Sequence, residues 1–205
     1  MNQEAIFSSY YLAPISYYYY ATKYNVITDI NENFVKQTYR SRCYILSPNG
    51  VQSLSIPLIN IQKKQVIKDV KIAYNDNWQK NHWKSLEAAY RRSPYFEYYE
   101  DEFAMFYKNK VKYLVDFNLE LQEKISNLIS LSAPVKKSDK YITPNEDITD
   151  FRSSFSPKKE HSQLIFNEYM QVFSDRNKFA PNLSIIDLLF NEGPNSLNYL
   201  KSIQQ

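Results

Sequence analysis

The sequence predicts a single α+β domain (mixed α/β) over residues 1–205. Its central sheet is expected to include a hairpin at about 38–58 and to be packed by helices at about 77–92 and 110–131. Three observations predict this class. An Asn-Gly pair lies between two apolar runs, which is the strongest short hairpin signal. Apolar residues recur at helical spacing in the later stretches. The length also suits one domain with its own core.

The N-terminal segment predicts a strand, a helix and a second strand. Residues 4–10 suit a short strand, and Pro14 suits the first turn of a helix that ends near Lys23. Consecutive tyrosines at 17–20 lie in this helix, so at least one of their rings must be exposed whichever face is buried. Residues 26–30 then predict the second strand.

The hairpin is predicted from alternation on both sides of a tight turn. Residues 38–46 alternate, Pro48-Asn49-Gly50 close the turn, and residues 51–58 return as the partner strand. One face of the first strand is expected to carry Tyr39, Cys43 and Ile45. The opposite face then carries Arg40, Arg42, Tyr44 and Leu46.

The middle of the chain is expected to be mainly helical. Residues 66–74 predict one more strand, after which Asn75 or Asn77 can cap a helix that ends near Arg91. Residues 103–131 continue helically, with a break or kink around Asn109. The later part of this stretch carries a stripe at helical spacing, formed by Val111, Leu114, Val115, Asn118, Leu121, Ile125 and Leu128.

A change of composition follows at 132–160, where prolines, serines and charged runs predict a flexible loop. Residues 169–173 predict a last strand. This part of the chain therefore contributes little regular structure in the prediction.

The C-terminal block predicts a buried helix and a short final one. Ser184 followed by Asp187 is a helix-start signature, so residues 184–190 predict a helix. Gly193 is expected to end it in a left-handed cap, and Pro194 to begin the last helix.

Composition and charge exclude several classes of function. Apolar residues make up 43% of the chain and charged residues 23%, which is typical of globular rather than disordered proteins. The net charge is only +3, and basic residues alternate with acidic ones. Because affinity for phosphate backbones needs clustered cations, no nucleic-acid partner is expected.

The chain is expected to be cytoplasmic and not inserted in a membrane. No apolar run approaches the roughly 18 residues that cross a bilayer, and the N-terminus lacks signal-peptide features. With Cys43 as the single cysteine, no internal disulfide can form. Neither glycine lies in a Gly-rich phosphate loop, which excludes nucleotide binding through those motifs.

The densest chemical signal is the block 78–96, which holds His82 between two tryptophans. His82 can act as a general acid–base, because imidazole titrates near neutral pH, and Glu87 lies close by for proton transfer. Trp83 and Tyr90 can stack on a ring. The alternative is an imidazole that is packed and hydrogen-bonded at a helix start.

The apolar C-terminal helix predicts a second site residue. Asp187 in such surroundings is costly unless it is paired with a donor or a cation. It can orient His82, or it can cap the local backbone, and the sequence leaves both open.

Cys43, His161 and the cations of the hairpin complete the candidates. Cys43 is either a nucleophile or a buried strand residue, and His161 is expected to be solvated in the loop. The spacing of the three potential ligands Cys43, His82 and His161 matches no zinc pattern, so neither metal nor cofactor is expected. Lys36, Arg40 and Arg42 suit carboxylate or phosphate recognition, or form a solvated strand edge. The guanidinium groups of the two arginines can hold a carboxylate or phosphate through paired hydrogen bonds.

Several blocks resemble the WbqC-like proteins over nearly the full length. They are 36–42, Asn49-Gly50 with Leu54-Ser55-Ile56-Pro57, 78–96 and 179–194. The last block, Pro-Asn-Leu-Ser-x-x-Asp-Leu-Leu-Phe-Asn-x-Gly-Pro, is the most specific. The resemblance implies a role in O-antigen-type polysaccharide biosynthesis, as a transferase of glycine or a related acyl group onto an amino sugar.

The chain also departs from the pattern of that family. Many members open with His-Gln-Pro-Asn-Tyr-Leu-Pro, and Phe7 stands here where they have the histidine. The usual Gln-Tyr before the lysine is Asn33-Phe34, and a Gly-free stretch at 132–165 replaces a Gly-rich segment.

The sequence therefore supports two functions. In the first, the chain is an acyl- or aminoacyltransferase on a nucleotide- or lipid-linked amino sugar: His82 is the base, oriented by Asp187 or Glu87. Lys36 and Arg42 would hold a phosphate or carboxylate, Asn182 would donate to the oxyanion, and Trp83 with Tyr90 would stack on the sugar. In the second, it is a non-catalytic glycan- or protein-binding member that uses its tyrosine-rich face at 17–20 and 95–99. The oligomeric state stays open.

Overall fold

A four-stranded parallel sheet forms one half of the fold in the computed structural model, which describes residues 3–131, 136–145, 148–157 and 163–205. The strand order is β5–β2–β1–β6. The central pair consists of β1 (Glu4–Phe7) and β2 (Asn25–Thr28), with Ala5 opposite Val26. The short edge strands are β5 (Lys136–Lys137) and β6 (Thr149–Asp150). The α+β class is thereby confirmed.

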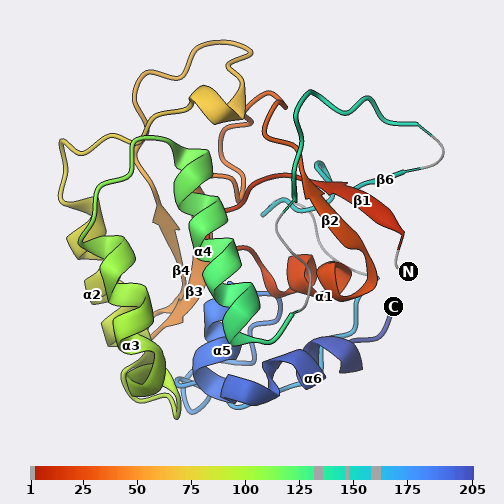
Figure 1. Cartoon of the computed structure of the whole chain (residues 1–205). Coiled ribbons are helices and arrows are strands. Elements are labelled where there is room, and N and C mark those ends of the chain that lie inside the picture. Colours follow the sequence, from red (N-terminus) through yellow and green to blue (C-terminus); the bar gives the residue numbers. More distant parts are fainter. Residues whose placement is uncertain (1–2, 132–135, 146–147, 158–162) are drawn as a thin grey trace.

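The helix α1 (Ile15–Lys23) joins β1 to β2 and begins directly after Pro14, as the sequence predicts. It is buried on most sides. The rings of Tyr17, Tyr18 and Tyr19 are almost fully buried, and Tyr20 is the partly exposed member of the four. The helix α6 (Ser196–Ser202) packs on α1, so these tyrosines lie between a sheet and a second helix (Figure 1).

The predicted hairpin consists of β3 (Arg42–Ser47) and β4 (Gly50–Ser55). It forms a two-stranded sheet of its own rather than part of the parallel sheet. Gly50 has a φ of 101°, which the turn requires and which glycine adopts without strain. Cys43 and Ile45 face the core, and the helix α2 (Trp78–Tyr90) packs against this hairpin.

The predicted helical stretch after α2 is divided into two helices. These are α3 (Phe96–Ala104), followed by the 3₁₀ turn Met105–Tyr107, and α4 (Leu114–Leu128). The break at 108–113 agrees with the expected interruption at Asn109. Most of the predicted apolar stripe is buried on α4, whereas Val111 precedes the helix and Leu128 is partly buried.

Two predicted strands are wrong. The stretch 66–74 contains the 3₁₀ helix Ile67–Asp69 and isolated bridges at Val66, Lys71 and Ile72. The apolar residues of this stretch are buried at alternate positions by irregular chain, without the continuous hydrogen bonding of a β-strand. The stretch 169–173 is also irregular. In the described parts of 132–160, where the sequence predicts a loop, the chain supplies β5 and β6 to the sheet.

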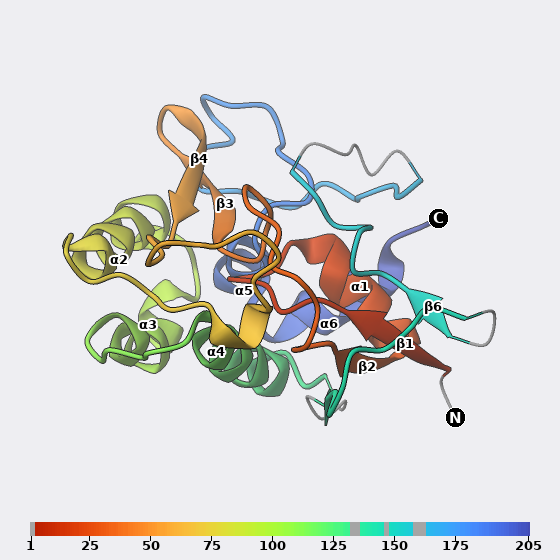
Figure 2. The same ribbon diagram turned by 90° about the horizontal axis from the view of Figure 1, so that it is seen from above.

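The C-terminal helices lie as predicted. Ser184 caps α5 (Ile185–Glu192), its hydroxyl accepting from the Ile186 amide. Gly193 has a φ of 53°, and a Cβ there would lie 2.5 Å from the Tyr95 ring, so only glycine fits. Ahead of α5, the irregular segment runs beside the hairpin (Figure 2), where Leu46 packs with Phe173 and Leu183.

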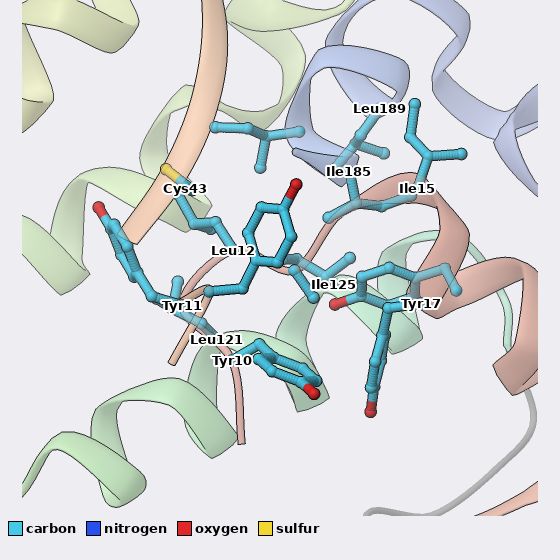
Figure 3. Close-up of a cluster of buried hydrophobic side chains, with 14 of the residues drawn as sticks. Tyr10, Tyr11, Leu12, Ile15, Tyr17, Cys43, Leu121, Ile125, Ile185 and Leu189 are labelled. Atoms are coloured by element: carbon cyan, nitrogen blue, oxygen red, sulfur yellow. The ribbon is translucent and has the colours of Figure 1, made fainter. Parts of the chain in front are cut away.

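Aromatic rings make up much of the core between these elements. Figure 3 shows Tyr10, Tyr11 and Tyr17 together with Cys43 and Ile185, which come from three separate parts of the chain. The hydroxyl groups of such rings must be hydrogen-bonded when they are buried. Within the described ranges, no helix has the length and apolar character needed to span a bilayer.

Buried ion pairs fill the edge where the parallel strands end. Arg40 forms a two-point ion pair with Glu32, with Nε–Oε1 and Nη2–Oε2 distances of 2.9 and 2.7 Å. Arg152 follows β6 and bonds both Asp29, at 2.5 Å, and Asp150, at 2.6 Å. Arg40 also donates to the backbone carbonyl of Arg152 at 3.1 Å, which joins the two groups.

The ion pairs of Arg152 should be essential for stability. Replacing Arg152 with methionine leaves Asp29 buried and unpaired, which should lower the free energy of unfolding by about 3–5 kcal/mol. The exposed pair of Lys136 and Glu4 supplies the control, because Lys136→Met should cost less than about 1 kcal/mol. Urea denaturation at pH 7 measures both. An Arg152→Met variant as stable as the Lys136→Met variant would contradict this assignment.

Candidate functional site

His82 lies on α2 in a buried hydrogen-bonded chain of side chains. His82 is only 6% exposed, and its Nδ1 lies 2.9 Å from the Tyr11 hydroxyl. The same hydroxyl lies 2.8 Å from that of Tyr107. Tyr11 follows β1, His82 lies on α2 and Tyr107 lies in the 3₁₀ turn. Their polar groups are thus hydrogen-bonded to one another inside the core.

The His82 ring is neutral in this environment. Burial lowers its pKa from 6.5 to about 4, and a hydrogen bond to the Ser55 backbone opposes this shift only partly. Tyr11 engages Nδ1, and the Ser55 backbone also bonds the ring, so the imidazole is packed and hydrogen-bonded in the core. This geometry matches the packed imidazole that the sequence left open as an alternative.

The tryptophans near His82 are part of the core. The ring of Trp78 lies 5.1 Å from His82, edge to face. Trp83 packs against Phe96 and Tyr107, at 6.0 and 5.6 Å between ring centroids. Trp83 is therefore held by neighbouring rings rather than presented as an open stacking surface.

Cys43 is a buried strand residue. Its thiol is fully buried, and burial raises its pKa well above the ordinary value. A nucleophilic cysteine needs a lowered pKa and access to solvent, and Cys43 has neither. His161 lies outside the described residues.

Asp187 forms a second buried polar group, separate from His82. It is fully buried on α5, and Oδ2 accepts hydrogen bonds from the Tyr169 hydroxyl at 2.5 Å and from the Gln171 amide at 2.9 Å. Tyr90 lies against the same carboxyl group. Burial raises the pKa of Asp187 above its ordinary value, although these donors oppose the shift.

The structure does not join Asp187 to His82. The hydrogen bonds described for His82 go to Tyr11 and to the backbone of Ser55. Tyr90, which meets Asp187, lies eight residues after His82 on α2, or about 12 Å along the helix axis. Of the predicted site residues, the structure thus brings Asp187 and Tyr90 together and leaves His82 apart.

The remaining predicted site residues are dispersed. Lys36 is exposed, and Arg42 is half-buried at the start of β3, its Nε buried without a hydrogen-bond partner among the described residues. Glu87 pairs with Arg91 at 2.8 Å on the surface of α2. Asn182 uses its side-chain oxygen to accept from the Ser16 amide at 2.8 Å, so it caps the first turn of α1.

A surface pocket opens beside the Asp187 group. It has a volume of about 630 Å³ and is lined entirely by one segment, through Glu168, Tyr169, Met170, Gln171, Ser174, Asn177, Lys178 and Phe179. Tyr169 and Gln171 belong both to this lining and to the hydrogen bonds of Asp187. A buried acid with a shifted pKa beneath a pocket is a common mark of a functional site.

Gln171 fixes the shape of this segment. Its amide nitrogen donates to the Ala180 carbonyl at 3.0 Å, and its amide oxygen accepts from the Ala180 backbone at 3.0 Å. The side chain is almost fully buried. The segment is therefore closed on itself by Gln171 and tied to α5 by Asp187, which gives the pocket a defined wall.

The sequence analysis missed Tyr169 and Gln171 as site residues. The available signal was the need of a buried Asp187 for donors. The donors come from irregular chain 16–18 residues upstream, where no periodicity indicates which side chains turn inward. Within the described ranges, no three His, Cys, Asp or Glu side chains form a possible metal-ligand group.

Phe7 is embedded in a cluster of rings at the end of β1. Its ring lies 5.0 Å from Phe151 and 6.0 Å from Phe155, both stacked, and 5.1 Å from Tyr17 in an edge contact. Phe7, the position at which the sequence resemblance led us to expect a histidine, is thus part of the apolar core here.

The buried His82 should make stability depend on pH. Between about pH 6.5 and 4 the unfolded chain binds a proton at this imidazole and the folded chain does not, so stability is full above pH 6.5 and falls on acidification. The loss specific to His82 should reach about 3 kcal/mol at pH 4. Urea denaturation of wild type and His82→Gln at several pH values measures it. Parallel pH profiles for the two proteins would contradict the burial of a neutral ring.

Comparison with known proteins gives one relative and one family. Rv1507c, an uncharacterised protein of Mycobacterium tuberculosis (strain ATCC 25618 / H37Rv), is 24% identical over 201 residues, covering 84% of this chain and 85% of that protein. No solved structure matches the chain. The WbqC-like protein family matches residues 9–156 and 152–199, which is most of the sequence. The chain therefore belongs to the WbqC-like protein family.

Proposed function

We propose that this chain is a glycan-binding member of its family, and that it holds an amino-sugar unit in the pocket formed by 168–179. The observation that carries this proposal is the position of the pocket, whose wall residues Tyr169 and Gln171 are fixed by the buried Asp187. Asp187 belongs to the most specific sequence block shared with the family.

The chemistry of the lining suits a sugar. Ser174 and Asn177 supply hydroxyl and amide groups that can bond sugar hydroxyls, while the buried Gln171 holds the wall in place. Tyr169 and Phe179 pack edge to face at 5.2 Å and supply aromatic surface for the apolar faces of a pyranose. A volume of about 630 Å³ lies within the range of small-molecule sites.

The charged rim suits a modified sugar. Glu168 and Lys178 are both exposed at the pocket and carry opposite charges. A carboxylate can hold the amino group of an amino sugar, and an ammonium can hold a carboxylate or phosphate substituent. These contacts favour an amino sugar with an anionic group over a plain hexose.

The two other candidate regions support binding at this pocket by elimination. His82 is buried and its Nδ1 is hydrogen-bonded to Tyr11, so a route through this nitrogen as the base would first require breaking a core hydrogen bond. The carboxyl edge of the parallel sheet, where open α/β sheets often hold ligands, is filled by the ion pairs of Arg40 and Arg152.

Binding should be measured with glucosamine, N-acetylglucosamine and UDP-N-acetylglucosamine by titration calorimetry. At least one of these sugars should bind. Lys178→Ala should lower the affinity for the anionic UDP-N-acetylglucosamine by about fivefold, which is the size of one exposed charge contact. Lys201→Ala, on α6 and outside the pocket lining, is the matched control. Binding that is unchanged in Lys178→Ala, or equal losses in both variants, would contradict the assignment to this pocket.

A transferase reaction is the second candidate, and one observation favours it. Asp187, with its raised pKa, is one hydrogen bond from the pocket through Tyr169. In this scheme Tyr169 would take a proton from the sugar amine while passing its own to Asp187. The amine nitrogen would bond the acyl carbon, the carbon–sulfur bond of the thioester would break with its electron pair on sulfur, and the departing thiolate would take up the proton held by Asp187.

The transferase is tested by an acyl-transfer assay with acetyl- and glycyl-thioesters and the amino sugar that binds. Asp187→Asn should lower the rate by about 10²–10⁴, as expected for loss of an acid–base group. His82→Gln should stay within about threefold of wild type, since His82 does not reach the pocket in this scheme. A large loss in His82→Gln with little loss in Asp187→Asn would restore His82 as the base. Absence of turnover in a protein that binds the sugar would leave the binding function alone.

A further inference from the structure

A second concavity lies on another side of the chain, at the junction of α3 and α4. It has a volume of about 290 Å³ and is lined by Glu102, Met105, Phe106, Asn109, Val111, Glu120 and Lys124. None of these residues lines the 168–179 pocket. The two helices run side by side in both views (Figures 1 and 2), and the 3₁₀ turn after α3 forms part of the wall.

The floor of this groove is apolar and partly open. Met105 is 61% exposed, which is unusual for a large apolar side chain next to a core. Phe106 and Val111 are partly buried and pack against the main core. Phe106 is braced by an edge contact with Phe117 at 6.2 Å, so this floor is backed by buried residues.

The rim of the groove carries an excess of carboxylates. Lys124 pairs with Glu102 at 2.5 Å, and Glu120, one turn before Lys124 on α4, has no cationic partner among the described ion pairs. The neighbouring lysines do not supply one, because Lys110 and Lys112 lie over tyrosine rings. A carboxylate without a partner therefore lies beside an apolar floor.

The surrounding surface has the same sign. From the start of α3 to the end of α4, residues 96–128 contain seven acidic residues and four lysines, a net charge of −3, although the whole chain has a net charge of +3. This face therefore attracts cations while the chain as a whole repels them, and such a local field steers association with a partner of opposite charge.

We propose that this groove is a docking site for a basic segment of a partner protein, in which a lysine or arginine is flanked by an apolar residue. The aliphatic stem would lie on Met105, Phe106 and Val111, and the cationic end would bond Glu120. A volume of about 290 Å³ falls just below the usual range for small-molecule sites, so it suits one or two side chains better than a whole cofactor. The site is independent of the proposed sugar pocket.

Methionine methyl NMR tests this proposal on the full chain. The sequence has three methionines, of which Met105 lines the groove and Met170 lines the sugar pocket, so one spectrum reports both sites. The probes are three peptides, Ac-Leu-Lys-Leu-NH2 and its analogues with norleucine or glutamate in place of lysine. The lysine peptide should shift the methyl resonance of Met105 and leave that of Met170 unchanged. The two analogues should bind at least about threefold more weakly than the lysine peptide.

Charge variants separate the proposed contact from a general surface effect. Glu120→Gln should lower the affinity for the lysine peptide by about two- to fivefold. Glu123→Gln, an exposed carboxylate of the same helix outside the groove lining, should have a smaller effect. Three results would overturn the proposal: equal binding of the lysine and norleucine peptides, no shift of Met105 at about 5 mM peptide, or a Met105 shift that depends on protein concentration without peptide. The last would identify a second copy of the chain as the occupant.

Discussion

The ion pairs of Arg40 and Arg152 are the interaction on which the rest of the structure depends. Arg152 bonds Asp29 and Asp150, which follow or end two different strands of the parallel sheet. Arg40, just before the hairpin, reaches Glu32 and the backbone of Arg152. Because charges buried this deeply are costly unless paired, the edge of the sheet and the entry to the hairpin must form together.

The buried ion pairs fill one end of the sheet, and the candidate site residues His82 and Asp187 lie elsewhere, in separate places. The carboxyl edge of the sheet, where β1 ends at Phe7, is filled by ion pairs and aromatic rings. His82 is hydrogen-bonded to Tyr11 within the core. The open polar surface is left to the segment before α5, where Asp187 and Gln171 hold a pocket rather than a packed interface.

Much of the fold could be predicted because local signals agree with it. Asn49-Gly50 predicts the hairpin, Ser184 predicts the start of α5, and the stripe of α4 predicts its buried face. The stretch 66–74 fails because alternation alone cannot distinguish a strand from irregular chain that buries every other side chain. The edge strands β5 and β6 have only two residues each, too few to leave a pattern.

The site was less predictable than the fold, because its contacts join distant or irregular parts of the chain. The need of Asp187 for a partner follows from its apolar helix, but Tyr169 as that partner does not. Likewise, Trp83 and Tyr90 carry the residue types of a stacking surface, and only their packing shows that Tyr90 is buried in the core and that Trp83 packs against it. Residue type predicts what a side chain can do, and burial decides whether it does so.

The central claim is that ligand binding takes place over Asp187 and not at His82. Intermolecular NOEs between a bound amino sugar and the labelled protein test it most directly. The account predicts contacts from sugar protons to the Met170 methyl group and to the rings of Tyr169 and Phe179, which line the pocket. Contacts to the rings of His82 or Trp83 would contradict it and would place the site at the buried imidazole.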